Sequence, residues 1–339
     1  MMRVGIVGFG FMGRMHYRCW RRLEDVEITA ICDVNPVTVK NAQEAVGNIE
    51  GAAEDLDLSG IKIYGDFHEM LCEERLDAVS LTLPTYLHAE FSIKALDAEV
   101  NVLCEKPMSL DVRACERMIE AAKKSGKVLQ VGHCVRFWPE YAKAKEIVAG
   151  GEYGEVVAAS FRRLCARPQW AWDGWVVDEK RSGGMALDLH IHDTDFVQYL
   201  FGVPRGVQSF GTRDSEARLT HIVTQYLYDD RKVVTAEGSW AMMPSFGFEM
   251  SFNIMLEKAS LAYDCTRTPA LRVCPKEGEA FAPEVAEGDG YLLEIAHFAG
   301  KIRGEKAEDV ITLEQSRNSV KIVAAEQESV ETQKLVLLG

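Results

Sequence analysis

The clearest chemical signal in the sequence is a glycine-rich motif near the N-terminus, GFGFMG. Its three glycines have the spacing GxGxxG and are Gly8, Gly10 and Gly13. The motif follows the apolar run 3–7 and precedes a helix-compatible segment, 14–23, and a β-branched run that ends at Asp33. A strand, a glycine turn, a helix, a second strand and an acid, in this order, predict a dinucleotide-binding site.

Each position of this motif has a physical role in binding a dinucleotide. Gly8 permits a tight turn, Gly10 lets the backbone approach a pyrophosphate, and Gly13 lets the helix lie close to the strand. The amides at the helix N-terminus attract the phosphate charge. Asp33 would accept hydrogen bonds from the ribose hydroxyls and repel a 2′-phosphate, which predicts NAD without excluding NADP. The other motif residues that we assign to the cofactor are Phe9, Phe11 and Met12.

Two later strand-like runs end in residues that should lie along the same cofactor. In a doubly wound sheet the ligand binds where the strand order reverses, outside the carboxyl ends of the strands. The run 101–104 is followed by Glu105, Lys106 and a proline, so Lys106 should point a cation toward the nicotinamide. A surface lysine that merely ends a strand is the structural alternative. The remaining residues that we assign to this edge are Thr82, Pro84, His88 and Glu105.

An acid–base pair is predicted in the segment 182–195, SGGMALDLHIHDTD. In a helix, Asp188 and His192 share one face, whereas His190 points nearly the opposite way. An aspartate one turn before a histidine can fix its tautomer, which makes His192 a candidate general base. His190, His192 and Asp193 are weaker candidates as metal ligands, because a helix separates the histidines and no other cluster completes a shell, so we expect no metal. Histidines that only pack against polar neighbours remain the structural alternative.

Two further segments supply candidate substrate contacts. Trp170, Trp172 and Trp175 lie among Pro, Asp and Gly residues, and aromatic rings in such loops stack on sugars or pack in a core or interface. Arg136 follows the last strand of the first pattern, where it contacts substrate or cofactor or forms a structural ion pair. The residues that we assign to the substrate are Arg136, Trp172 and His190.

The elements that must position these residues change type near residue 133. Before it, six strand-like runs alternate with helical patterns, which predicts a doubly wound parallel sheet with strand order 3-2-1-4-5-6. The expected strands are 3–7, 28–32, 62–64, 78–83, 101–104 and 128–131. The expected helices are 14–23, one that starts at Asn35-Pro36, one capped by Asp66 that runs through Cys72, 85–96 and 109–124.

After residue 133 the strand-like runs follow one another without long helices between them, which predicts a mostly antiparallel sheet. These runs are 156–163, 218–227, 232–240, 249–257 and 259–264, with helices at 140–148 and 184–200. Thr312 and Gln315 form a capping-box pattern for a terminal helix, and 275–290 reads as a surface loop. We therefore predict an α/β domain over 1–133 and an α+β domain with an open-faced sheet over 134–339, with a terminal helix that packs back on the first domain.

The composition excludes several classes of function. The 339-residue chain carries a net charge of −14, which argues against nucleic-acid binding, since that affinity comes mostly from Lys and Arg. Its nine cysteines form no CxxC pair, which predicts free thiols and a cytoplasmic location. No apolar run approaches the roughly 20 residues that span a bilayer, and no signal peptide is expected because the N-terminus is already a strand.

With these residues in place, the chain resembles the glucose–fructose oxidoreductase / inositol dehydrogenase / rhizopine-catabolism (Gfo/Idh/MocA) family of NAD(P)-dependent dehydrogenases. The segments that carry the resemblance are VGIVGFGFMG at the start, LPTYLHAE at 83–90, CEKP at 104–107, VGHCVRFWP at 131–139 and SGGMALDLHIHDTD at 182–195. The resemblance implies a Rossmann domain followed by an open-faced sheet domain that mediates homodimer or homotetramer formation.

The resemblance also implies roles for single residues. Lys106 looks like the lysine that contacts both nicotinamide and the substrate hydroxyl, and Asp188 and His192 look like the aspartate and the acid/base histidine of the D-(x)3-H pair. His190 departs from the family, in which this position is usually small. The implied activity is hydride transfer between nicotinamide and a hydroxyl carbon of a sugar, cyclitol or related polyol. The alternatives are a glycoside hydrolase that oxidises its substrate transiently and a non-catalytic NAD or sugar sensor.

Overall fold

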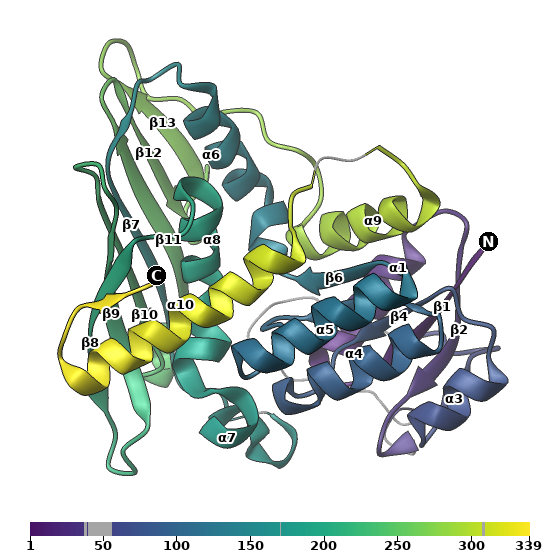
Figure 1. Cartoon of the computed structure of the whole chain (residues 1–339). Helices are drawn as coiled ribbons and strands as arrows, with labels where there is room; N and C mark the ends of the chain where they lie inside the picture. The colour runs from purple at the N-terminus through teal and green to yellow at the C-terminus, as the bar shows by residue number, and fades with distance from the viewer. Residues whose placement is uncertain (37–38, 40–55, 170, 307–308) are drawn as a thin grey trace.

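The computed structural model describes residues 1–36, 39, 56–169, 171–306 and 309–339. The helix expected to start at Asn35-Pro36 lies largely outside the described residues, as does Trp170. The described chain forms two sheets that stand beside each other, each with its own helices, and the long helix α10 (Leu313–Thr332) runs between them (Figure 1).

The first sheet is parallel and has the strand order β3-β2-β1-β4-β5-β6, which confirms the sequence prediction. Its strands are β1 (Met2–Val7), β2 (Val26–Cys32), β3 (Lys62–Tyr64), β4 (Ala78–Leu81), β5 (Asn101–Glu105) and β6 (Leu129–Gly132). Its helices are α1 (Phe11–Arg21), α3 (Phe67–Glu73), the short η1 (Thr85–Leu87), α4 (His88–Asp97) and α5 (Val112–Ser125). Helices cover both faces, so the central strands are buried on both sides.

The second sheet is mostly antiparallel, again as predicted, with the order β13-β12-β11-β7-β10-β9-β8-β14 and a parallel pairing of β10 with β7. Its strands are β7 (Val156–Cys165), β8 (Gly206–Arg213), β9 (Leu219–Leu227), β10 (Val233–Ser239), β11 (Phe248–Leu256), β12 (Ala259–Asp264), β13 (Leu271–Pro275) and β14 (Val336–Leu337). The helical segments around it are η2 (Cys134–Phe137), α6 (Pro139–Gly150), η3 (Trp172–Val177), α7 (Glu179–Ser182), η4 (Ala186–His190), α8 (Ile191–Phe201) and η5 (Pro244–Phe246).

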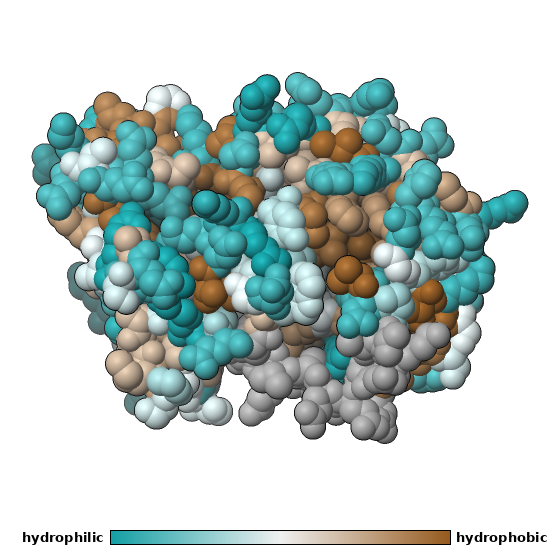
Figure 2. All heavy atoms as spheres, turned by 90° about the horizontal axis from the view of Figure 1, so that it is seen from below, coloured by the Kyte–Doolittle hydropathy of each residue, from teal (hydrophilic) through white to brown (hydrophobic). Residues whose placement is uncertain are grey.

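Helices α6, α8 and α10 lie on one face of the second sheet, and the other face is left uncovered (Figure 1). Alternation along the strands places apolar side chains on this open face as well as in the core. The exposed apolar residues of the open face are Phe210, Val223, Val233 and Met255. Elsewhere, the side of the molecule seen in Figure 2 is mainly hydrophilic, with hydrophobic residues in separate patches, in keeping with the acidic composition.

Two terminal helices attach the sheets to each other. Helix α10 begins with the predicted capping box of Thr312 and Gln315 and contacts α5 and β6 as well as β8 and α8. Helix α9 (Gly290–Arg303), which the sequence pattern did not predict, lies against α1 and η2 (Figure 1). Asp289 caps it by accepting a hydrogen bond from the Leu292 amide. None of the described helices combines the length and the apolar character needed to cross a membrane.

Candidate active site

The glycine loop has the geometry that a dinucleotide requires. Gly8 has a φ of +85°, and a Cβ there would lie 2.7 Å from the Thr82 carbonyl oxygen. A Cβ on Gly13 would overlap the carbonyl oxygen of Gly8, so this glycine lets α1 pack directly on the loop. A Cβ on Gly10 would meet nothing within 4 Å, which leaves the backbone open to a pyrophosphate. No side chain caps α1, so its first amides point at the same space.

Asp33 closes the other side of this loop. Its Oδ2 accepts a hydrogen bond from the Phe9 amide at 2.7 Å, and its Oδ1 accepts one from the Asn35 amide at 2.8 Å. Phe9 is buried, whereas Phe11 and Met12 are half-buried at the start of α1. Asp33 directly follows β2, the position at which the dinucleotide-binding fingerprint has its ribose-binding acid.

The residues expected along the cofactor at the ends of β4 and β5 mostly hold the protein together. Thr82 donates its hydroxyl to the carbonyl oxygens of Val7, at 3.1 Å, and Gly8, at 2.5 Å, which ties the glycine loop to β4. Pro84 is half-buried and starts η1. His88, which was also predicted to lie along the cofactor, is 1% exposed, and its ring nitrogens lie 2.7 Å from the Pro107 oxygen and 2.8 Å from the Leu83 oxygen. The buried ring thus lies between the segments that follow β4 and β5 and is in contact with a carbonyl oxygen of each.

Glu105 and Lys106 point in different directions from the end of β5. Glu105, which was predicted to lie along the cofactor, is buried, and its side chain accepts hydrogen bonds from His16 Nε2 at 2.9 Å and from the Lys106 amide at 3.1 Å. Lys106 Nζ instead reaches across to the second sheet's helical segment. It donates to the Asp188 carbonyl oxygen at 2.7 Å and lies 3.3 Å from Asp188 Oδ1.

Asp188 lies in η4, a π-helical turn that precedes α8. The sequence predicted an α-helix in which Asp188 would fix His192. Instead Asp188 pairs with Lys106, and His192 Nδ1 is buried without a hydrogen-bond partner among the described residues. The physical reason is the i→i+5 bonding of a π turn, which alters the angle between positions four apart. Burial, with the nearby charges of Lys106 and Arg163, holds the pKa of His192 well below its usual range, so the imidazole is neutral.

Two predicted substrate residues are buried in structural contacts. His190 is 0% exposed, lies against Gly238 in β10, and its Nε2 is 3.5 Å from Glu326 Oε2 in α10. Arg136 is 1% exposed and forms a two-fold ion pair with Asp195 at 2.8 and 2.7 Å. Neither side chain is available to a substrate, because each is turned toward a buried carboxyl group from a distant part of the chain.

Trp172, by contrast, lies at the surface, with 59% of its area exposed. The Arg181 guanidinium lies 5.9 Å from the Trp172 ring centre and 5.3 Å from that of Tyr86, which is also exposed. Sequence reasoning missed Tyr86, although it falls inside the LPTYLHAE segment. These residues form an aromatic rim that joins the first domain's η1 to the second domain's η3.

A buried ion pair that sequence reasoning also missed fixes the helix that carries His192. Arg163 of β7 bonds Asp193 through Nε at 2.8 Å and through a terminal nitrogen at 3.2 Å, with both side chains buried. Asp193 is therefore committed to Arg163 and does not join the histidines as a metal ligand. The sequence held one signal for this pair, an acid directly after the candidate base.

The sequence of the chain matches known family models over both of its parts. Residues 2–133 match the model described as an oxidoreductase family with an NAD-binding Rossmann fold, and residues 141–262 match the GFO/IDH/MocA C-terminal domain.

Similar proteins include several sugar and cyclitol dehydrogenases. Myo-inositol 2-dehydrogenase of Thermotoga maritima is 33% identical over 204 residues, which cover 59% of this chain and only 55% of that protein. D-glucoside 3-dehydrogenase of Escherichia coli is 27% identical over 357 residues, covering 98% of this chain and 96% of that one. The structure of levoglucosan dehydrogenase with NADH and levoglucosan superposes with a TM-score of 0.82 at 20% identity and covers 99% of each chain, which shows a common fold.

Proposed function

Because the chain belongs to the GFO/IDH/MocA family of NAD-binding oxidoreductases, we propose that it is a dehydrogenase that acts on a hydroxyl carbon of a sugar, cyclitol or related polyol. The observation that carries the proposal is the meeting of Lys106, from the end of β5, with Asp188, from η4, at 2.7 and 3.3 Å. The ammonium group of Lys106, from the cofactor domain, thus lies beside the segment of the second domain that carries the proposed acid–base residue.

The chemistry divides between the cofactor and these side chains. NAD, when bound, supplies the hydride acceptor. Neutral His192 accepts the proton of the substrate hydroxyl. Lys106 stabilises the negative charge that develops on that oxygen, and Asp188 holds the lysine in position. The role of Asp188 thus changes from orienting the imidazole to orienting the ammonium group.

The proposed substrate class rests on two supports. The relatives named above act on inositol, a D-glucoside and levoglucosan, all of which carry neighbouring hydroxyl groups. The aromatic rim adds chemistry suited to a ring, since Trp172 and Tyr86 offer exposed faces on which a sugar can stack. We therefore keep Trp172 as a substrate contact and add Tyr86 to it.

The assembly and location are further parts of the proposal. The open face carries exposed Phe210 and Val223 opposite each other on paired strands, with Val233 and Met255 beyond them, which suits burial against a second copy in a homodimer or homotetramer. All nine cysteines are unpaired, which supports a cytoplasmic location. We place the domain boundary at residue 133, between β6 and η2.

A substrate screen with matched variants tests the proposal. Inositols, polyols, sugars and glycosides are each mixed with the protein and NAD or NADP, and reduced nicotinamide is followed by absorbance. We expect stoichiometric NADH with at least one of these compounds. Lys106→Ala and His192→Ala should lower turnover by about 10²–10⁴-fold, while Lys123→Ala, an exposed lysine of α5, should not.

The other outcomes identify the rival functions. Glycoside cleavage without net NADH would show the hydrolase that oxidises its substrate transiently. Binding of NAD and sugar without any turnover would show a sensor. Full turnover by both the Lys106 and the His192 variant would remove these residues from the mechanism.

A further inference from the structure

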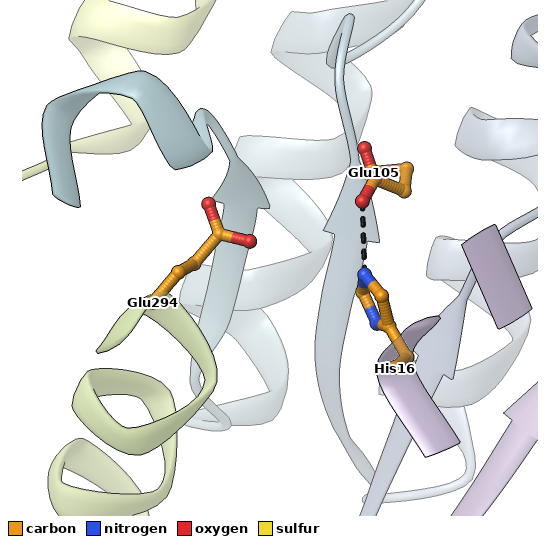
Figure 3. A group of neighbouring side chains, drawn as sticks. All are labelled: His16, Glu105 and Glu294. Atoms are coloured by element: carbon orange, nitrogen blue, oxygen red, sulfur yellow. Dashed lines mark hydrogen bonds and ion pairs between the residues drawn. The ribbon is translucent and has the colours of Figure 1, made fainter. Parts of the chain in front are cut away.

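Glu294 in α9 is a buried carboxyl group that the proposed chemistry does not use. It is 0% exposed, and neither of its oxygens has a hydrogen-bond partner among the described residues. Its side chain extends from α9 toward Glu105 and His16 (Figure 3). The facing atoms of the three groups lie within 4.8 Å of one another. Gly132 leaves room for this approach, since a Cβ there would lie 3.3 Å from both Glu294 Oε1 and the Glu105 Cα.

Glu105, the neighbour of Glu294, joins two parts of the candidate active site. Its Oε1 accepts from His16 in α1, the helix that starts at the glycine loop. Its Oε2 accepts from the backbone amide of Lys106. One carboxylate therefore links the helix that faces the pyrophosphate to the backbone of the proposed catalytic lysine.

Two buried carboxyl groups at this separation do not both carry a charge, because each would repel the other where no water screens them. Burial by itself would raise the pKa of Glu105, but the hydrogen bond and charge of His16, with the charge of Lys106, leave it lowered. Burial first, and then the charge of Glu105, raise the pKa of Glu294 well above its usual range. The extra proton therefore belongs on Glu294.

We propose that Glu294 is a positioning residue that stays protonated, packs beside Glu105, and so leaves Glu105 the charge with which it bonds His16 and the Lys106 amide. Ionisation of Glu294 would set two negative charges against each other and push Glu105 away from one or both of its donors. The cofactor helix and the lysine would then lose their common anchor. The consequence for Lys106 rests on the proposed function, whereas the location of the proton does not.

One imidazole and two carboxylates are also a ligand set that suits a metal ion. His16 Nε2, the atom that would bind it, contacts Glu105 directly at 2.9 Å, as a hydrogen-bonded donor and acceptor do. A hydrogen bond accounts for this contact, and a metal ion bound to Nε2 would have to replace it.

Other titratable groups also surround the pair, and the test must account for them. Those that face Glu294 or Glu105 are His16 and Cys19 from α1, His88 from α4, Lys106 after β5, Cys134 from η2 and Tyr291 from α9 itself. A comparison of Glu294→Gln with the unchanged protein removes their contribution, because both proteins keep all of these groups.

The first experiment measures unfolding by denaturant from pH 5 to pH 8. The folded protein keeps a proton on Glu294 that the unfolded chain loses above pH about 4.3. The stability of the unchanged protein therefore falls with rising pH relative to Glu294→Gln, until the folded pKa is reached. The folded-to-unfolded ratio should fall by close to tenfold for each pH unit in this window. Glu116→Gln, an exposed residue of α5, should run parallel to the unchanged protein. A Glu294→Gln curve that is also parallel would overturn the proposal.

The second experiment measures NAD affinity, which needs no known substrate. When the pH is raised until Glu294 ionises, the unchanged protein should lose affinity severalfold, while Glu294→Gln should hold it over the same pH range. Glu294→Ala, which leaves the buried space beside Glu105 unfilled, should bind NAD severalfold more weakly at every pH. Equal losses in the unchanged protein and in Glu294→Gln would show that Glu294 is structural only. A stoichiometric metal ion that is present in the purified protein and absent from Glu294→Ala would also overturn the proposal. If both experiments succeed and Lys106→Ala retains turnover, the proposed function fails and the Glu294 proton stands.

Discussion

The two halves of the candidate site are held in place by different means. Lys106 follows β5, at the same carboxyl edge of the parallel sheet as the glycine loop after β1, with β4 between the two strands. Asp188 and His192 stand on a π turn and a helix whose orientation depends on buried side chains from distant strands and helices. Arg163 holds Asp193, and Glu326 faces His190.

This difference teaches how each half responds to change. Backbone hydrogen bonds between neighbouring strands position most of the strand half, and buried side-chain contacts such as that of His16 with Glu105 add to the sheet there. Buried contacts between polar side chains position the helix half. Removing one partner of such a contact lowers the free energy of unfolding, because the other partner is left buried and unpaired. Substitutions far from the reacting atoms should therefore disturb the helix half more than the strand half.

The largest effect is expected from breaking the buried pair behind His192. Asp193→Asn leaves the Arg163 guanidinium buried without a counter-charge, and the loss should be about 3–5 kcal/mol in the free energy of unfolding, measured with urea. Asp173→Asn is the matched control, because it removes the same charge from a 2.9 Å pair with Arg181 in which Asp173 is exposed. That exposed pair should contribute at most about 1 kcal/mol. Equal losses in the two variants would show that burial does not set the cost of breaking the Arg163–Asp193 pair in the helix half.

The next effect is expected at the strand on which His190 rests. A Cβ on Gly238 would lie 2.8 to 3.1 Å from His190 Nδ1, Cβ and Cγ, so Gly238→Ala forces η4 to move. We expect a loss of about 1–3 kcal/mol in unfolding free energy, as overpacking gives. Turnover should fall, and the dissociation constant for NAD should stay unchanged. The same substitution at Gly150, where a Cβ meets nothing within 4 Å, should change neither turnover nor the dissociation constant for NAD. A weaker NAD affinity in Gly238→Ala would show that the halves are not separate.

The same contrast explains which parts of the fold follow from the sequence. The strand half is predictable because each buried run is short, each is followed in the sequence by a helical pattern, and the strand order of such a sheet follows from its connections. Strand β3 and the Asp66 cap of α3 stand where the pattern put them. Strand β8 was missed because GVQSFGTR is polar and rich in glycine. Helix α9 was missed because its first turn begins with glycine and lacks a Glu or Gln at the capping-box position, although Asp289 was a usable start signal.

The site shows the same limit at the level of side chains. Motif spacing was enough to single out Lys106, Asp188 and His192 as candidates. It was not enough to place His190 and Arg136, whose direction is set by Glu326 and Asp195 through tertiary contacts. The π turn is likewise a product of packing and has no signature in residue spacing. The identity of a candidate was thus easier to predict than its orientation.

A third effect should appear when the pH is lowered. Burial lowers the pKa of His190 to about 3, whereas an unfolded histidine has a pKa of about 6.5. Below pH 6.5 the unfolded chain gains a proton that the folded protein refuses, so stability falls with pH. Between pH 7 and pH 5.5 this one residue should account for a loss of about 1.3 kcal/mol. His190→Gln should lack this loss when its urea curves at the two pH values are compared.

His68→Gln is the control for that measurement, because His68 is exposed on α3 in the strand half. It should lose as much stability between pH 7 and pH 5.5 as the unchanged protein does. If His190→Gln behaves in the same way, His190 takes up its proton in the folded state. The helix half would then be less dependent on desolvated groups than its burial indicates.

The smallest effect is expected at Thr312, which starts the helix that touches both halves. Its hydroxyl accepts from the Gln315 amide at 3.1 Å, and Gln315 Oε1 accepts from the Thr312 amide at 3.3 Å. Thr312→Ala should lower the unfolding free energy by about 1 kcal/mol, and Thr312→Ser should restore most of it. Turnover should change little, because the cap lies about four turns before Glu326, where α10 meets His190. A large fall in turnover at full stability would mean that the first turn of α10, which also contacts Arg136 through Gln315, sets the position of α8.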